Sequence, residues 1–446
     1  MTLGGRRPRA GRRKGTGPVA TDVDDQVTVG TSEAADAAPL KLAYVMSRFP
    51  RLSETFVLGE ISAVLEQGVE VELFPLLRTD EDVVHAEAAP LVERARYQPF
   101  LSHRVLASQL HFLRSKPRAY LGALVDVVRG TWGSRNYLVG ALGIFPKVVH
   151  AARLMAADGI DHVHCHFANH PAVAGLVVQR LTGIPFSFTA HGFDLHVDRH
   201  MLCRKVAEAD FVVPISRYNR ELIVAECGER ARPKLTVIHC GVDTDFFRPP
   251  ESPPPGSPFT VLCVGTLHEV KGQSFLVDAC ARLAEAGVEV RCTLVGDGPD
   301  RRALTRQIEA AGLGERVTIA GRRTRAEVAA LLRETCVLAT PSVPTAEGKR
   351  EGIPVVLMEA MASGVPVVAS DLSGIPELVD DGVSGLLVPP RDPQALAAAL
   401  RLLHDDPALR ARLGAAGRDT VVREFDVRVN ADKLLRRIRE RVQVPA

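Results

Sequence analysis

The chain has 446 residues, of which 46% are hydrophobic and 24% are charged, and its formal net charge is +2. This composition is that of a soluble globular protein, and the length exceeds what one ordinary hydrophobic core supports, so we expect two domains. The small net charge excludes a partner selected by bulk electrostatics alone.

Residues 1–38 are expected to form a disordered arm. They begin MTLGGRRPRAGRRKGTG and continue as an acidic, alanine-rich stretch. No apolar segment follows the arginines, so we expect no secretory signal here. The arm could contact anionic lipid or nucleic acid, and a plain solvated tail is the alternative. We expect no nucleic-acid partner, because the chain carries no recognised nucleic-acid-binding motif.

Residues 39–248 are predicted to form the first domain. LKLAYVMSRFP is typical of a buried strand, SETFVLGEISAVLEQG has helical periodicity with Ser53 as its N-cap, and VEVELFPL returns to strand. This βαβ opening implies a parallel sheet. IDHVHCHF, PFSFTAHG, DFVVPIS and KLTVIHCGVD predict four further short strands, each followed by a loop.

The segment 100–157 is predicted to be helical and amphipathic, with Trp132 and Tyr137 among many basic residues and little acid. Such a face can lie on an anionic membrane surface, and an ordinary solvated helix face is the alternative. The basic residues are Arg104, Arg114, Lys116, Arg118, Arg129, Arg135 and Lys147.

The strand DHVHCHF would place His162, His164 and His166 on one face, which raises the possibility of a metal site. Neighbouring positions on one strand give poor tetrahedral geometry, and no matching Cys/His pair follows in the sequence. We therefore expect no metal.

The proline-rich segment 249–258, PPESPPPGSP, is predicted to be a linker, because it cannot form a helix or a central strand. Strands and helices alternate again in 259–425, the predicted second domain, and 426–446 is predicted to be a terminal helix. The fold class is therefore α/β, with two Rossmann-like domains that face each other across a cleft. Open parallel sheets bind ligands beyond the carboxyl ends of their strands.

The eight cysteines are scattered and form no CxxC pair. This pattern predicts free thiols in a reducing cytosol. No apolar run reaches the ~18–20 residues that a membrane-spanning helix needs, so we expect none.

Two carboxylates eight positions apart mark the most informative segment, 351–364. Gly352 permits close approach of the backbone to a ligand, and Pro354 suits the first position of a helix that ends before Gly364. Eight residues of helix rise about 12 Å. Glu351 and Glu359 could therefore flank one elongated ligand at a helix N-terminus, which attracts phosphate or sugar hydroxyls.

This segment and its surroundings, PSVPTAEGKREGIPVVLMEAMASGVPVVASDLSGIPELVDDGVSGLLVPP, resemble the E-x7-E signature of glycosyl transferases group 1, which are retaining enzymes of the GT-B fold. SETF near the N-terminus is similar to the subgroup that builds exopolysaccharides such as colanic acid. The resemblance implies the GT-B architecture, with a terminal helix that crosses back to the first domain.

The activity implied by the resemblance is transfer of a sugar from a UDP- or GDP-linked donor to a hydroxyl of a glycan or lipid-linked acceptor, with the anomeric configuration retained. It also implies no cofactor and a cytoplasmic location, with peripheral contact at the inner face of the plasma membrane as a further expectation. The alternatives are a nucleotide-sugar hydrolase or epimerase of the same fold, and a non-catalytic scaffold at the membrane face.

The resemblance also assigns roles in the second domain. Glu351 holds the donor sugar together with the amides of Gly352 and Ile353, with Pro354 beside them, while Glu359 binds the ribose. Lys271 holds the diphosphate. Thr266 stands where an arginine is expected, and Lys349, Arg350 or Arg322 could compensate for the missing charge. Gly296 and Gly298 lie either near the nucleotide or in a purely structural turn.

From the first domain, the resemblance places His191 beside the transferred sugar, where a neutral imidazole could accept a hydroxyl proton. A histidine of the core is the alternative. Ser53, Glu54 and Thr55 replace the glycine-rich donor loop of many relatives, and a simple helix cap is the alternative there. Glu377 is either a solvated residue at a helix start or a residue of the cleft.

Overall fold

The computed structural model of the chain describes residues 39–51, 54–79, 88–196, 199–252 and 258–442. The predictions for the arm at 1–38, for Ser53 and for most of the linker lie outside these residues.

Five parallel strands form the sheet of the first lobe, in the order β2-β1-β3-β4-β5. Every residue of β3, β4 and β5 is buried, as expected for a parallel sheet that is covered on both faces. The strands are β1 (Lys41–Phe49), β2 (Glu70–Arg78), β3 (His162–His166), β4 (Phe186–Ala190) and β5 (Phe211–Pro214).

The predicted strand KLTVIHCGVD is wrong: this segment makes isolated bridges, from Leu235 to Val212 and from Val242 to Asp426, but forms no regular strand. Helices cover the sheet between the strands. They are α1 (Thr55–Glu66), α2 (Ala89–Arg94), α3 (His103–Ser115), α4 (Pro117–Thr131), α5 (Arg135–Ala157), α6 (His170–Thr182), α7 (Phe193–His196), α8 (Leu202–Glu208) and α9 (Arg217–Cys227), with a 3-10 turn η2 (Glu229–Lys234).

The prediction of helix for 100–157 is confirmed by α3, α4 and α5, but two of its residues do not lie on a basic surface. Lys147 is buried, donates to the carbonyl of Leu76 and lies 4.2 Å from the ring centroid of Phe100. Tyr137 is buried too and stacks on His170. A long lysine stem can reach an acceptor inside a core, which the amphipathic pattern alone does not reveal.

Helix α5 is long and apolar enough to cross a membrane by length and composition. It passes this test, although the sequence holds no unbroken apolar run of that length, because mean hydropathy tolerates isolated charges such as Lys147. In this protein 56% of the apolar window of α5 is buried, which is typical of a core helix.

Six parallel strands form the second sheet, in the order β11-β10-β9-β6-β7-β8. The strands are β6 (Phe259–Val264), β7 (Val290–Val295), β8 (Val317–Gly321), β9 (Val337–Thr340), β10 (Val367–Ser370) and β11 (Leu386–Val388). The connecting helices are η3 (Glu269–Lys271), α10 (Gln273–Glu285), α11 (Arg301–Ala310), α12 (Arg325–Arg333), α13 (Val355–Ala362), η4 (Ile375–Glu377) and α14 (Pro393–Asp405). The predicted α/β class with two parallel sheets is confirmed.

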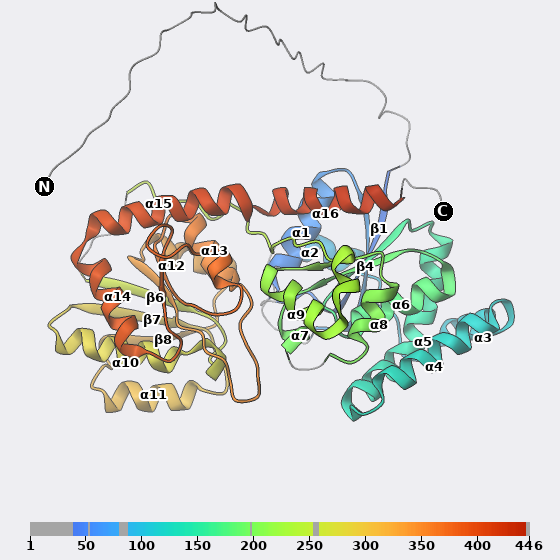
Figure 1. Cartoon of the computed structure of the whole chain (residues 1–446), viewed down its shortest axis with the longest axis horizontal. Coiled ribbons are helices and arrows are strands. Elements are labelled where there is room, and N and C mark those ends of the chain that lie inside the picture. Colours follow the sequence, from blue (N-terminus) through green and yellow to red (C-terminus); the bar gives the residue numbers. More distant parts are fainter. Residues whose placement is uncertain (1–38, 52–53, 80–87, 197–198, 253–257, 443–446) are drawn as a thin grey trace, which may run out of the picture. The chain divides into compact units, whose positions relative to one another are not determined.

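The last two helices, α15 (Pro407–Glu424) and α16 (Val427–Val442), lead the chain from the second lobe to the first (Figure 1). Helix α16 packs against α1, and its Leu434, Leu435 and Ile438 are buried in the same apolar cluster as Leu42 and Ile61. The amide of Val242 donates to the carbonyl of Phe425 at 2.9 Å where α16 begins. The first lobe therefore completes its core with the C-terminal helix.

Candidate active site

A cleft of about 680 Å³ receives side chains from both lobes. It lies beyond the carboxyl ends of the strands, where the loops after β3, β4, β6 and β9 meet, as the rule for open parallel sheets predicts. The residues predicted for the site that line it are Glu54, Thr55, His191, Thr266, Lys271, Glu351, Gly352, Ile353, Pro354 and Glu359.

Helix α13 supplies one wall of the cleft. Its N-cap is Pro354, with φ −62° and ψ 125°, so the proline precedes the helix instead of occupying its first position. Gly364 follows the helix with φ +71°, as predicted for a helix stop. A Cβ on Gly352 would lie 3.0 Å from the carbonyl oxygen of His191, so a small residue lets the loop before α13 lie against the first lobe.

Glu359 lies on the second turn of α13 and is 8% exposed. Burial raises the pKa of this carboxyl to about 7, although the nearby Arg325 lowers it. Glu359 therefore titrates near neutral pH, whereas a solvated glutamate would be fully ionised. It lines the same cleft as Glu351, so the two carboxylates do flank one space.

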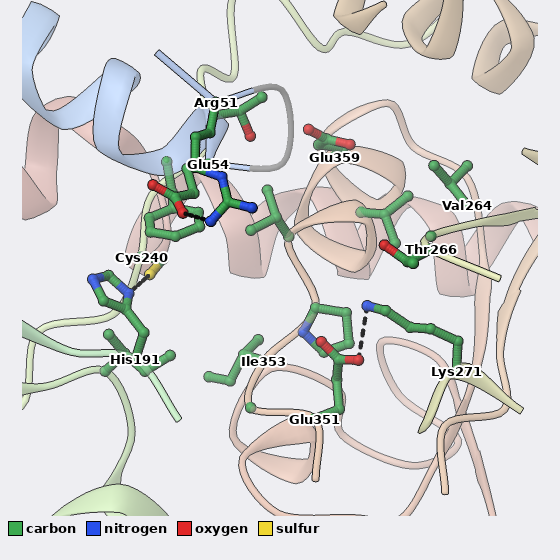
Figure 2. Close-up of a pocket in the computed structure, with 18 of the residues that line it drawn as sticks. Arg51, Glu54, His191, Cys240, Val264, Thr266, Lys271, Glu351, Ile353 and Glu359 are labelled. Carbon is green, nitrogen blue, oxygen red and sulfur yellow. Dashed lines mark hydrogen bonds and ion pairs between the residues drawn. The ribbon is translucent and has the colours of Figure 1, made fainter. Parts of the chain in front are cut away.

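Glu351 and Lys271 form an ion pair with Oε2 and Nζ 2.7 Å apart, and both side chains are partly exposed, at 17% and 24% (Figure 2). Lys271 ends the 3-10 turn η3, and its stem packs against Gly265 at the end of β6. Each side chain neutralises the charge of the other. An anionic ligand that contacts Lys271 must therefore compete with the carboxylate of Glu351.

Thr266 has no charge, but several cations line the same cleft. Of the three residues that could compensate for the missing arginine, only Arg350 lines the cleft; Arg322 and Lys349 do not, and Lys349 pairs with Glu347 at 2.9 Å. The other cations in the described lining are Arg51, Arg323 and Arg325. No sequence motif pointed to Arg323 and Arg325: Arg323 lies in the loop before α12, and Arg325 is the first residue of that helix.

Arg51 and Glu54 come from the loop after β1 and pair with each other at 3.1 Å. Both point into the cleft region from the first lobe (Figure 2). A carboxylate by itself would repel a phosphate, but the guanidinium of Arg51 beside Glu54 brings the local charge of the pair close to zero.

Gly296 and Gly298 do not line the cleft. A Cβ on Gly296 would lie 2.0 Å from the carbonyl oxygen of Gly265, and one on Gly298 would lie 2.4 Å from that of Leu267. The two glycines therefore allow the turn after β7 to press against the 265–267 loop, which carries Thr266. Of the two roles considered for them, these contacts favour the structural one.

His191 ends the first-lobe wall, directly after β4. Burial lowers the pKa of its imidazole well below the usual value, and the adjacent His166 and His164 lower it further, so the ring is neutral at pH 7. Its Nε2 lies 3.1 Å from Nδ1 of His166, and its Nδ1 lies 3.6 Å from Sγ of Cys240, which also lines the cleft (Figure 2).

The loop that carries His191 is held by Asp194, a buried carboxylate that the sequence analysis did not single out. Its Oδ1 accepts from the amides of His191 at 3.0 Å and Gly192 at 2.8 Å, and its Oδ2 accepts from the amide of Ala168. Burial raises the pKa of Asp194, while these amide donors oppose that rise. An aspartate three residues after the histidine, at a helix start, was the available signal.

Behind His191, the ring nitrogens of His164 and His166 and a carboxylate oxygen of Glu60 lie within 4.8 Å of one another. His162 belongs to the predicted face but pairs with the hydroxyl of Ser187 at 2.7 Å. The convergence of His164 and His166 was predicted, and Glu60 was missed because it comes from α1. The absence of a metal stays a prediction.

Glu377 joins the two lobes. Its carboxylate oxygens accept from the amides of Arg217 at 2.8 Å and Tyr218 at 2.9 Å, in the first turn of α9. A carboxylate at a helix N-terminus satisfies donors that the helix leaves free. Neither of the two roles considered for Glu377 is correct, because a cap from another part of the chain is invisible to local sequence patterns.

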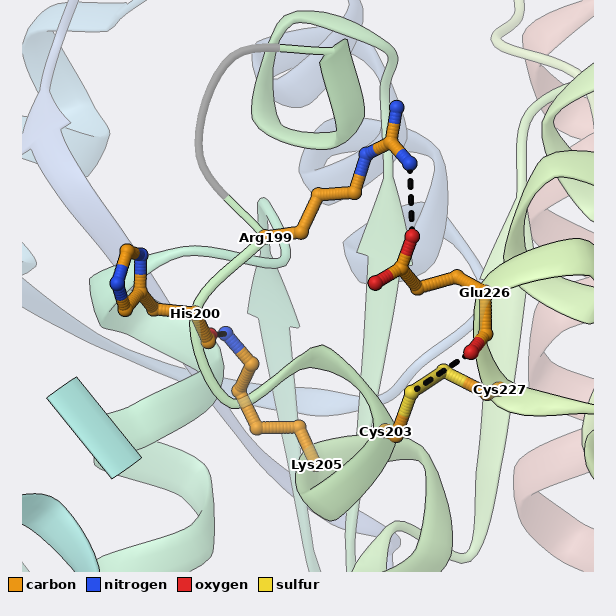
Figure 3. Close-up of a disulfide and its surroundings, with 6 residues drawn as sticks. All are labelled: Arg199, His200, Cys203, Lys205, Glu226 and Cys227. Carbon is orange, nitrogen blue, oxygen red and sulfur yellow. Dashed lines mark hydrogen bonds and ion pairs between the residues drawn. A yellow bond between two sulfur atoms is a disulfide. The ribbon is translucent and has the colours of Figure 1, made fainter. Parts of the chain in front are cut away.

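The prediction that all cysteines are free thiols is wrong. Cys203 and Cys227 form a disulfide between α8 and the end of α9, with Cα atoms 5.0 Å apart (Figure 3). The two residues are 24 positions apart, and only the packing of α8 against α9 brings them together. Among the free cysteines, Cys240 alone lines the described part of the cleft.

Both halves of the chain match known families. Residues 245–420 match the family described as Glycosyl transferases group 1, and residues 53–246 match Glycosyltransferase Family 4. A protein of Escherichia coli strain K12 with the name "Putative colanic acid biosynthesis glycosyltransferase WcaL" is 34% identical over 382 residues, which cover 81% of this chain and 90% of that protein. The chain belongs to the glycosyl transferases group 1 family.

A second relative of this glycosyltransferase is the amylovoran biosynthesis glycosyltransferase AmsK of Erwinia amylovora. It is 30% identical over 425 residues, which cover 90% of this chain and 100% of the relative. The alignments with both relatives span most of each chain, so the similarity includes both lobes of the glycosyltransferase.

Solved structures share the fold. The crystal structure of Anabaena Alr3699/HepE in complex with UDP has a TM-score of 0.68 at 19% identity and covers 90% of this chain and 100% of that chain. The sucrose-phosphate synthase of Thermosynechococcus elongatus has a TM-score of 0.65 at 21% identity and covers 90% and 98%. The two-lobed GT-B architecture of the glycosyltransferase is therefore established.

Proposed function

We propose that this glycosyltransferase moves a sugar from a UDP- or GDP-linked donor to a hydroxyl of a glycan or lipid-linked acceptor in exopolysaccharide biosynthesis. The observation that carries the proposal is the Lys271–Glu351 pair, which lies with Glu359 in one cleft between two Rossmann-like sheets. The names of the relatives, which refer to colanic acid and amylovoran, support the pathway. The UDP in the complex of the structural neighbour supports a nucleotide-sugar donor.

In this proposal Lys271 holds the diphosphate of the donor. Arg350, Arg323 and Arg325 are further cations that line the same cleft, and Arg325 also contacts Asp243 and the ring of Phe246. Glu359 accepts hydrogen bonds from the ribose hydroxyls. Binding of the donor releases Glu351 from Lys271, and Glu351 then holds the sugar together with the backbone of Gly352. Fixed cations and a helix N-terminus stabilise the leaving diphosphate, so no metal takes part.

Transfer retains the anomeric configuration because the acceptor attacks the same face that the diphosphate leaves. The bond from the anomeric carbon to the phosphate oxygen breaks, the bond to the acceptor oxygen forms, and the hydroxyl proton passes to the leaving phosphate or to His191. The neutral imidazole of His191 faces this carbon from the first lobe. Closure of the lobes excludes water, which would otherwise hydrolyse the donor.

We also propose that the enzyme works in the cytoplasm, in contact with the anionic inner face of the plasma membrane. The contact surface is the α3–α4 face, defined by exposed Leu106, Leu110 and Leu113 on α3 and Leu121 and Val125 on α4. The three leucines of α3 follow the i, i+4, i+7 spacing of one helix stripe.

Charge supports this choice of partner. Six of the seven basic residues predicted for the helical segment are exposed on or next to α3, α4 and the start of α5; Lys147 is the exception. Ten of the fifteen exposed large hydrophobic residues in the described chain lie between residues 100 and 142. Apolar side chains beside basic ones bind anionic lipid by insertion and by charge together. The cytoplasmic location draws no support from the cysteines, because two of them form a disulfide.

A screen of UDP, GDP and their sugars against the purified full chain tests the proposed activity. One nucleotide series should raise the melting temperature, because a ligand at 100 times its Kd stabilises the folded state by about 2.7 kcal/mol. Incubation of that donor with and without isolated polysaccharide precursors then separates the alternatives. Sugar transfer that depends on the acceptor supports the proposal, whereas rapid turnover of donor alone shows a hydrolase or an epimerase.

A further inference from the structure

A chain of buried polar groups runs from His191 into the first lobe. His191 Nε2 lies 3.1 Å from Nδ1 of His166, and Nε2 of His166 lies 3.2 Å from Oε1 of Glu60. Tyr44 donates its hydroxyl to the same Oε1 at 3.1 Å. His166 and Tyr44 are completely buried, and the Glu60 side chain is 22% exposed. Three elements contribute to this chain, namely β1, α1 and β3, and the proposed function uses none of these three side chains.

The protons in this chain can be placed from the contacts. Nε2 of His166 has no well-aligned hydrogen bond within the described residues, and the carboxylate of Glu60 is the acceptor in reach. An ionised carboxylate only accepts, so Nε2 of His166 carries its proton, and in the neutral ring Nδ1 then presents a lone pair. His191 must then donate from its Nε2 to that lone pair. Its own Nδ1 is left as an acceptor.

The charge state of Glu60 supports this placement. Burial alone raises its pKa, but the contact with the Nε2–H of His166 and the hydrogen bond from the hydroxyl of Tyr44 favour the ionised carboxylate and bring the pKa below the usual value. Glu60 is therefore ionised at neutral pH. Burial also raises the pKa of Tyr44 well above the usual value, so the phenol keeps its proton and remains a donor.

At the cleft end of this hydrogen-bonded series, Nδ1 of His191 meets a thiol. Nδ1 of His191 faces Sγ of Cys240 at 3.6 Å, and burial raises the pKa of this cysteine, so the thiol stays protonated and can donate weakly. A hydroxyl of a substrate is a stronger donor than a thiol. It can take the place of Cys240 at Nδ1, because Cys240 and His191 both line the cleft.

We infer that Glu60 and His166 are positioning residues that hold His191 in the tautomer with Nε2 protonated and Nδ1 open to a substrate hydroxyl. This inference rests on the proposed function of the cleft. When Nδ1 accepts a hydroxyl proton, the positive charge on His191 is stabilised through His166 by the carboxylate of Glu60. The hydrogen-bonded residues lose no proton, and the only bond that they gain is the N–H bond at Nδ1 of His191. A base oriented by a second group, which a carboxylate orients in turn, is a recurrent arrangement in enzymes.

A metal ion held by Glu60, His164 and His166 is the competing explanation for the cluster. His164 argues against it, because both of its ring nitrogens already have partners: Nδ1 lies 2.8 Å from the hydroxyl of Ser187 and Nε2 lies 2.9 Å from that of Thr189. A metal at His164 would break one of these bonds in a fully buried place.

Ring nitrogen NMR of the full chain, labelled with 15N-histidine, reads the tautomers without any substrate. Signals of His166 and His191 are assigned with His166→Asn and His191→Asn. We expect both rings as the Nε2–H tautomer at pH 7. In Glu60→Gln, whose amide can either donate or accept, His166 should become a mixture of tautomers and His191 should follow. Glu66→Gln is the matched control on α1, because Glu66 contacts Arg428 at the surface and should change neither ring.

His191 with its proton on Nδ1 in the unmodified protein would overturn the inference, and this result does not depend on whether Glu60→Gln folds. Unchanged spectra of His191 in a folded Glu60→Gln protein would overturn it too. Stoichiometric metal in the purified protein, with spectra that change on chelation, would assign the cluster to a metal instead.

Kinetics supply the second measurement once a donor has been found. Glu60→Gln should lower kcat by roughly 10- to 100-fold while KM for the donor changes less than about threefold, because a positioning residue acts on the reacting geometry. Equal losses in Glu60→Gln and Glu66→Gln would contradict a specific role. Absence of transfer from every donor would overturn the proposed function and leave the tautomers untouched, so the two failures are distinguishable.

Discussion

The two walls of the cleft differ in their chemistry. The second lobe presents charged groups that are partly exposed, above all the Lys271–Glu351 ion pair at a helix N-terminus. The first lobe presents the neutral imidazole of His191, which buried hydrogen bonds hold in place, and the Arg51–Glu54 pair, whose opposite charges offset each other. A charged wall that can exchange partners suits an anionic leaving group, and a fixed neutral wall suits a hydroxyl. The difference suggests that each lobe handles one half of the transfer.

Replacement of Glu351 should have the largest effect on turnover. A small effect would contradict the role given to the charged wall of the second lobe. Glu351→Gln should lower kcat by about 100- to 1000-fold, the range for loss of one preorganised group that stabilises transition-state charge. Nucleotide affinity should not fall, because Lys271 loses its competing partner. Turnover and nucleotide titration on the same preparation check both statements.

Glu347→Gln is the matched control for this change. Glu347 lies four residues before Glu351, its side chain is 74% exposed, and it pairs with Lys349 outside the cleft. It should keep near-normal turnover. A Glu351→Gln enzyme as active as this control would contradict a catalytic role for Glu351.

The pH dependence of Glu359 sharpens the description of the charged wall. Its pKa in the folded protein is raised to about 7, above the usual value of 4.5, so the folded state binds more protons between these values. Stability from this group is therefore complete below about pH 4.5 and is lost as pH rises through 7, by up to about 3 kcal/mol.

Glu359→Gln should remove that dependence. Relative to the unmodified protein, the variant should gain stability between pH 5 and pH 8, as measured by urea unfolding across this range. Parallel stability curves for the two proteins would show that Glu359 does not titrate in this window and that its burial is relieved in another way.

Binding to lipid tests whether the first lobe also carries the acceptor side of the reaction. The double change Leu106→Glu and Leu110→Glu should reduce binding to vesicles that contain anionic lipid by roughly tenfold or more, because it places charge on the exposed stripe of α3. Flotation with anionic and zwitterionic vesicles measures this. Leu402→Glu, at an exposed leucine on α14, is the control. Equal binding by both variants would exclude the α3–α4 face.

The disulfide should have the smallest effect on the cleft. Cys203→Ser should lower the free energy of unfolding by about 3 kcal/mol, the loop-entropy estimate for a bridge across about 24 residues, and leave kcat/KM unchanged. Melting curves with and without reductant should differ for the unmodified protein and coincide for the variant. A large loss of kcat/KM would show that α8 and α9 hold the first-lobe wall in place.

Contiguous motifs predicted the fold and much of the cleft, because their physics is local. The alternation of strands and helices gave the two parallel sheets, and the segment 351–364 gave the helix N-terminus and both carboxylates. Gly296 and Gly298 show the limit of this reasoning. A glycine turn signals a close approach, but the sequence does not say whether a ligand or another loop approaches, and here it is the 265–267 loop.

Asp194 was missed despite a local signal, but most of the other missed residues depend on distant parts of the chain. Glu60 reaches His166 from a helix about 100 residues earlier, Glu377 caps a helix of the other lobe, and Cys203 meets Cys227 only when α8 packs on α9. Lys147 looked like a surface cation because its acceptor, the carbonyl of Leu76, lies on strand β2, far from α5 in the sequence. Pairings of this kind follow from the fold, which a single sequence gives only in outline.

Calorimetric titration of UDP and GDP into the unmodified protein, Lys271→Ala and Lys349→Ala measures whether Lys271 holds the diphosphate. We expect one nucleotide to bind the unmodified protein and Lys349→Ala alike. Lys271→Ala should bind it at least about tenfold more weakly, because a charged group in the cleft contributes more than about 1.4 kcal/mol to holding a phosphate. Equal affinity for all three proteins would contradict the assignment of the cleft as the donor site.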